Sequence, residues 1–93
     1  MKNNKLNGVA KYWSEEGDLI NEVEYFNGLL HGEWKEYFPS SGIKSVSRYK
    51  FDKKDGLQIT YHINGNKKSE SYFTDGIQTS ETLRWTIDGI LIK

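Results

Sequence analysis

The fold is decided by residues 56–65, which read Gly-Leu-Gln-Ile-Thr-Tyr-His-Ile-Asn-Gly. Apolar side chains alternate with polar ones along this stretch, and the same alternation recurs in residues 83–87. A period of two is the pattern of a β-strand with one buried face. The closing Asn64-Gly65, like Asp88-Gly89 later in the chain, predicts a two-residue hairpin turn of type I′, because both central residues of that turn need a positive φ angle.

The stretch is one copy of a repeat that returns every 24 residues. Its opening Gly56 recurs as Gly8 and Gly32, and Ser80 continues the series. An aromatic residue stands five positions after each of these four residues. Other matched positions are a second glycine, at Gly17, Gly42, Gly65 and Gly89, and a later aromatic residue, at Tyr25, Tyr49 and Tyr72. Self-similarity at this spacing indicates an array of one supersecondary unit.

We expect an all-β fold, with about eight strands joined by sequential hairpins into an antiparallel meander that forms a twisted single-layer sheet. The expected strands cover residues 8–14, 18–26, 32–38, 43–51, 56–63, 67–73, 79–87 and 90–93. Residues 14–17 and 39–42 are read as longer hairpin loops with a left-handed glycine. Residues 1–5 form a tail, and residues 6–93 form one domain with units at about 8–31, 32–55, 56–79 and 80–93.

Residues 30–42, Leu-His-Gly-Glu-Trp-Lys-Glu-Tyr-Phe-Pro-Ser-Ser-Gly, followed by Tyr49, resemble the MORN variant repeat. The preceding residues 25–28, Tyr-Phe-Asn-Gly, match the end of the same pattern. The resemblance covers residues 6–93, with departures at residues 51–56, which lack the Asn-Gly, and at Ser80. It implies a β-hairpin array. In bacteria it further implies an antitoxin-like protein of the YwqK type, which would neutralise a partner toxin by binding it.

Composition narrows the classes of function. The 13 basic and 13 acidic side chains give a formal net charge of zero, so the chain has no overall basic surface for nucleic acid or an anionic membrane. There is no cysteine, and neither His31, in a predicted turn, nor His62, on the polar side of its strand, has a partner at metal-ligand spacing. We therefore expect no enzyme, cofactor or metal site. With no signal peptide or membrane span in the sequence, we expect a cytoplasmic protein.

Two sets of aromatic side chains differ in their expected role. The first set is expected to fall on one side of the strands and form the main buried stripe, with a partner-binding trough as the alternative. It comprises Trp13, Tyr37, Tyr61 and Trp85, with Val9 beside them. The second set lies on the opposite side by alternation and is our candidate for the partner-contact surface. It comprises Tyr12, Trp34 and Phe38.

Charge is uneven along the chain. Residues 12–43 are acidic, with Glu15, Glu16, Asp18, Glu22, Glu24, Glu33 and Glu36 against only Lys35. Residues 44–68 are basic, with Lys44, Arg48, Lys50, Lys53, Lys54, Lys67 and Lys68 against Asp52 and Asp55. The two halves are either solvated faces or surfaces complementary to a partner. From the acidic half, Glu22, Glu24 and Glu36 join the candidate partner surface.

The last candidate is Leu91, in the apolar segment Ile90-Leu91-Ile92. This segment either packs on the sheet or pairs with another strand, as in a homodimer formed through an edge. The function we expect is a non-enzymatic protein-binding module in an antitoxin or immunity-type role. The alternatives are a structural or self-associating array and a lipid binder at a membrane surface. Only the basic residues 44–68 support the lipid binder.

Overall fold

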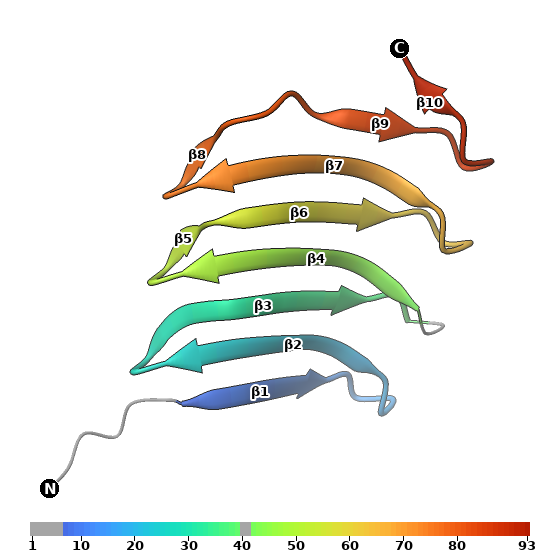
Figure 1. Cartoon of the computed structure of the whole chain (residues 1–93). Coiled ribbons are helices and arrows are strands. Elements are labelled where there is room, and N and C mark those ends of the chain that lie inside the picture. The colour runs from blue at the N-terminus through green and yellow to red at the C-terminus, as the bar shows by residue number, and fades with distance from the viewer. Residues whose placement is uncertain (1–6, 40–41) are drawn as a thin grey trace, which may run out of the picture.

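The computed structural model describes residues 7–39 and 42–93, which form one antiparallel sheet (Figure 1). The strands are β1 (Gly8–Trp13), β2 (Leu19–Phe26), β3 (Leu29–Tyr37), β4 (Ile43–Lys50), β5 (Lys53–Lys54), β6 (Gly56–Tyr61), β7 (Lys67–Thr74), β8 (Ile77–Gln78), β9 (Leu83–Trp85) and β10 (Leu91–Ile92). Their order in the sheet is β1-β2-β3-β4-β6-β7-β9-β10, with β5 on β4 and β8 on β7. The predicted all-β meander is confirmed.

The sheet has ten strands instead of about eight because two short strands, β5 and β8, precede the expected strands at 56–63 and 79–87. β5 and β6 together extend the expected strand at 56–63, and β8 and β9 replace the one at 79–87. The interruption before β6 lies at Asp55-Gly56, where Gly56 has a φ angle of 115° and the Arg48 side chain lies across the backbone. The pairing register also shifts at this place in the hairpin of β2 and β3. The irregularity is therefore part of the repeat.

The hairpin turns differ from the prediction. Type I′ turns were expected at Asn64-Gly65 and Asp88-Gly89, which is wrong, because only the glycine of each pair has a positive φ angle. Each glycine instead ends a three-residue loop, as in the bond from the Gly65 amide to the His62 carbonyl at 2.9 Å. Two-residue turns with both φ angles positive occur at the opposite ends of the strands, at Asn27-Gly28, Phe51-Asp52 and Asp75-Gly76.

The Asn64 side chain makes two hydrogen bonds that hold its loop in place. Its Nδ2 donates to the Ile87 carbonyl at 2.8 Å, and its Oδ1 accepts from the Asn66 amide at 3.1 Å. The side chain thus ties its own loop to the next hairpin of the array. The expected left-handed glycines of the other two loops are confirmed, since Gly17 and Gly42 have φ angles of 95° and 94°.

The sheet is a single layer, with extents of 55 × 37 × 12 Å. Among the described residues, Val23 alone is a buried apolar side chain, at 3% exposure. It pairs with Ala10 on one side and Trp34 on the other. The expectation of a buried stripe through Val9 and Trp13 is wrong, because both side chains are 59% exposed. Within the described chain no second layer covers that side of the sheet.

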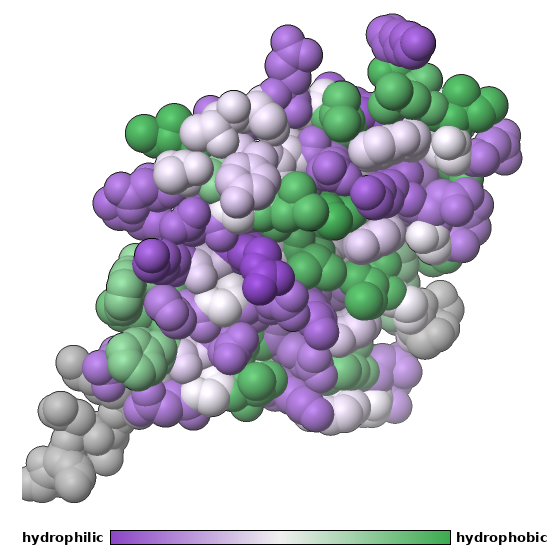
Figure 2. Space-filling view, in the orientation of Figure 1, coloured by the Kyte–Doolittle hydropathy of each residue, from purple (hydrophilic) through white to green (hydrophobic). Residues whose placement is uncertain are grey.

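The sheet has two distinct faces. The ladder face carries Trp13, Tyr37, Tyr61 and Trp85, and of these Trp13 is exposed and the other three are half-buried. Figure 2 looks onto this face, where a broken band of apolar side chains crosses the middle between charged ones. Register assigns Val46, Leu57 and Ile59 to the same face. The groove face is the opposite one and carries Val23, Trp34 and Ser47.

Candidate groove on one face of the sheet

Side chains on the groove face change from large to small along the array. One column of paired positions runs from Ala10 through Val23 and Trp34 to Ser47, and Gln58 pairs with Ser71 further along. A second column runs through Glu36, Ser45, Thr60 and Ser69 to Arg84. Because the hydroxyl residues fill less space than Val23 and Trp34, they leave a groove of about 480 Å³ over β3, β4, β6 and β7.

The floor of the groove is a polar network. The Ser45 hydroxyl donates to Glu36 Oε1 at 2.8 Å, and the hydroxyls of Thr60 and Ser69 lie 2.5 Å apart. The Gln58 Nε2 donates to the Arg48 carbonyl at 3.1 Å, but its buried Oε1 has no hydrogen-bond partner among the described residues. An unsatisfied buried acceptor costs free energy, and this oxygen is closed to solvent beneath the hydroxyl side chains.

Aromatic side chains lie at and beside the groove, where Phe73 lines the groove itself and Trp34 and Tyr49 line the smaller hollow next to it. Tyr49 and Phe73 occupy equivalent repeat positions on the groove face, at pairs with Lys54 and Gln78. The Trp34 and Tyr49 rings lie 5.9 Å apart, and the Lys54 Nζ lies 5.1 Å from the centre of the Phe73 ring. Burial, followed by the nearby Glu36 carboxylate, raises the pKa of Tyr49 above its ordinary value of 10.0.

The third aromatic of this series was misassigned. Tyr72 was taken as the equivalent of Tyr25 and Tyr49, but it pairs with Leu57 on the ladder face and is 48% exposed. Phe73 is the true equivalent, one residue further along. A strict spacing of 24 residues from Tyr49 identifies Phe73, so the signal was present in the sequence.

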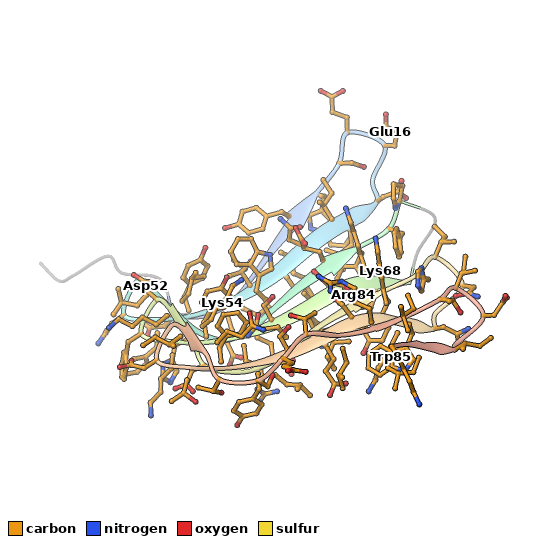
Figure 3. The ribbon with its side chains drawn as sticks, turned by 90° about the horizontal axis from the view of Figure 1, so that it is seen from above. Glu16, Asp52, Lys54, Lys68, Arg84 and Trp85 are labelled. Carbon is orange, nitrogen blue, oxygen red and sulfur yellow. The ribbon has the colours of Figure 1, made fainter. Side chains whose placement is uncertain are left out.

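Positive charge surrounds the groove. Lys44, Lys54 and Lys68 line it, against the single carboxylate of Glu36. All three lysines are exposed, and none makes an ion pair with any residue that the structure describes. Figure 3 shows Lys68 and Arg84 on one side of the ribbon and Trp85 on the other, in agreement with the register. The groove therefore carries uncompensated positive charge.

Two acidic side chains of the first half, Glu22 and Glu33, lie on the ladder face and are paired. Glu22 contacts Lys11 at 3.8 Å and accepts a hydrogen bond from the Tyr37 hydroxyl at 3.0 Å. Glu33 contacts Arg48 at 2.8 Å and Lys35 at 3.5 Å. Burial and the hydrogen bond to Glu22 raise the pKa of Tyr37 above 10.0. These carboxylates are thus engaged within the sheet.

The structure divides the seven predicted partner-binding residues between the faces. Tyr12, which is 43% exposed, shares the groove face with Trp34 and Glu36, and Phe38 lines the groove. The ladder face carries Glu22, Glu24 and Leu91, where Leu91 pairs with Trp85 and is 40% exposed. All seven cannot contact one flat partner at once. The groove lysines and the hydroxyl floor were missed, because each is unremarkable until the sheet places them together.

The histidines take part in packing. His31 was expected in a turn, but it lies in β3 with its ring 5.7 Å from the Phe26 ring and 4.7 Å from the Phe51 ring. The His62 Nε2 lies 2.9 Å from the Trp85 carbonyl. In residues 7–39 and 42–93, no three side chains of the metal-binding types gather closely enough to hold an ion. The same residues contain no helix with the length and apolar character needed to cross a bilayer.

Comparison with known families identifies the repeat. The family described as MORN repeat variant matches this chain three times, at residues 6–27, 30–51 and 54–75. The groove spans the second and third of these stretches. The family is a binding repeat and not a catalytic one. No curated protein and no solved structure matches the chain significantly.

Proposed function

We propose, since this chain belongs to the MORN repeat variant family, that it is a protein-binding module that receives its partner on the groove face. The observation that carries the proposal is the unfilled groove above a sheet 12 Å thick, in which Val23 is the one buried apolar side chain of the described residues. A sheet with so little buried interior leaves both of its faces accessible to a binding partner. Aromatic residues are enriched at protein-binding surfaces.

The specific role that we propose is that of an antitoxin or immunity-type protein, which blocks a partner by occupying its surface. The resemblance of residues 30–42 and Tyr49 to the bacterial variant repeat is the basis for this role. Such a protein needs affinity and no chemistry, which agrees with a binding repeat. Its partner would inhibit growth when produced alone.

The proposal is tested by affinity capture from the source cell, followed by co-expression. We expect one protein to be recovered in a fixed ratio, to inhibit growth when expressed alone, and to lose that effect when this chain is co-expressed. A double variant with Trp34→Ala and Tyr49→Ala should lose the partner, while Trp13→Ala on the ladder face should keep it. Recovery of only the chain itself would refute protein binding, and a harmless partner would refute the antitoxin role.

A self-associating array is the second candidate. The specific observation in its favour is the apolar segment Ile90-Leu91-Ile92, whose side chains are all exposed although Leu91 and Ile92 belong to β10, the last strand of the described sheet. An outer strand has unpaired backbone groups that can bind another strand. Light scattering over a range of concentrations separates the two candidates, because an array grows with concentration and a binding module stays at one mass.

A further inference from the structure

We propose that the groove on the groove face binds an acidic, extended peptide segment, which on the proposed function would belong to the protein partner. This inference depends on the proposed function only for the identity of the partner. The chemistry of the groove can be tested separately with a defined peptide. The charge of this ligand is opposite to the one expected from the sequence, because the acidic first half indicated a basic partner.

The argument begins with charge. Lys44, Lys54 and Lys68 are exposed, line one groove and lack ion pairs within the described chain, whereas Glu22 and Glu33 on the ladder face have cationic partners. The groove therefore presents a cluster of positive charge that no carboxylate of the described residues pairs with. A ligand that supplies carboxylates gains Coulomb energy there and is steered toward the groove.

The second step concerns hydrogen bonds. Trp34 Nε1 is a buried donor and Gln58 Oε1 a buried acceptor, and neither has a partner among the described residues. Trp34 lines a smaller hollow that adjoins the groove and shares Glu36, Ser45 and Lys54 with it. Both atoms are closed to solvent, so the groups that a ligand meets first are the hydroxyls of the groove lining. These hydroxyls can donate to the carbonyls of an extended peptide and accept from its amides.

The third step concerns shape. The floor consists of short hydroxyl side chains, and the longer Lys54 and Phe73 stand at its margin in cation–π contact. A ligand must enter the groove to reach Ser47, Thr60 and Ser71. A bilayer surface is broad and cannot enter a groove of about 480 Å³, whereas a single extended chain can. The polar floor therefore favours a peptide over a membrane.

The test uses a fluorescein-labelled peptide of ten residues that alternates glutamate with serine, and measures its anisotropy against the full chain at low salt. We expect binding that weakens as salt is added, and no binding of the matched peptide with glutamine in place of glutamate. Lys54→Ala and Lys68→Ala should each weaken binding about twofold to fivefold, in the range of an exposed charge pair. Lys50→Ala is the control, since Lys50 is exposed and lies in β4 outside the groove lining.

Three outcomes overturn the inference: equal affinity for the glutamine peptide, a loss in Lys50→Ala as large as in Lys54→Ala, or binding to phosphatidylserine vesicles without binding to the peptide. Circular dichroism of each variant confirms that the fold is kept. The inference and the proposed function fail separately. A native partner that still binds the Lys54→Ala and Lys68→Ala variants at full strength refutes the groove as its site and leaves the function standing. If the peptide binds but no native partner is recovered, the proposed function is refuted and the inference about the groove stands.

Discussion

Val23 and Val9 show at the scale of single residues how little of this sheet is interior. They are the same residue type on neighbouring strands, yet Val23 is 3% exposed and Val9 is 59% exposed. Val23 lies on the groove face between Ala10 and Trp34, whereas Val9 lies on the ladder face. The cost of shortening each side chain should follow this difference.

We predict that Val23→Ala lowers the free energy of unfolding by about 2 kcal/mol, because two buried methyl equivalents are lost and a cavity remains. The matched Val9→Ala should change it by less than about 0.5 kcal/mol, as for an exposed site. Urea unfolding of both variants measures the difference. Equal losses in the two variants would contradict the assignment of the packed part of the sheet to the groove face.

Tyr37 gives a prediction about pH. Its folded-state pKa is raised above 10.0 by burial and by its hydrogen bond to Glu22. The folded protein therefore keeps a proton that the unfolded chain has begun to release, so the stabilisation is complete below about pH 10 and declines as pH rises through the folded pKa. Urea unfolding between about pH 9 and about pH 11 should show a smaller alkaline loss in Tyr37→Phe than in the parent. An identical alkaline loss in both would contradict this assignment.

The β-hairpin is the repeating element of this protein, and the order of the hairpins could be predicted from the sequence for a physical reason. Alternation fixes which side chains share a face, and the spacing from Gly32 to Gly56 fixes the repeat. Which face of the sheet is packed could not be predicted from the sequence, because aromatic residues occur on both faces. The pairing of Glu33 with Arg48 was also hidden, since the two are 15 residues apart and meet only across strands β3 and β4. Without that pairing the acidic half looked like a free surface.

The opening glycine of each unit leads to a prediction at this scale. Gly32 has a φ angle of 118°, and a Cβ there would collide with the Glu24 carboxylate, whereas Gly17 has a φ angle of 95° and open space around it. Gly17→Ala should cost about 1 kcal/mol from backbone strain alone. Gly32→Ala should cost more, because Glu24 must also leave its place against the Glu33 amide.

A double-mutant cycle isolates the second contribution. In a Glu24→Ala background, the cost of Gly32→Ala should fall toward that of Gly17→Ala, as measured by urea unfolding. If the cost of Gly32→Ala is unchanged in that background, the glycine is needed only for its backbone conformation and not for the side chain that crosses it.

At the scale of the whole molecule, the repeat makes two unlike faces from one unit. Apolar side chains of the first hairpins fill the groove face near Val23, and hydroxyl residues of the later hairpins leave it hollow near Ser47. The positive charge follows the hollow and the paired carboxylates follow the opposite face. A binding module needs such an asymmetry, because a partner must be able to distinguish the two sides of a sheet.

The three indole N–H signals of the chain test this account most directly, because Trp34 faces the groove while Trp13 and Trp85 face the other way. Nitrogen–proton correlation spectra recorded during a titration with the glutamate–serine peptide report on all three at once. We predict that the Trp34 signal shifts progressively and that the signals of Trp13 and Trp85 stay in place. Shifts of Trp13 and Trp85 with Trp34 unmoved would contradict binding in the groove.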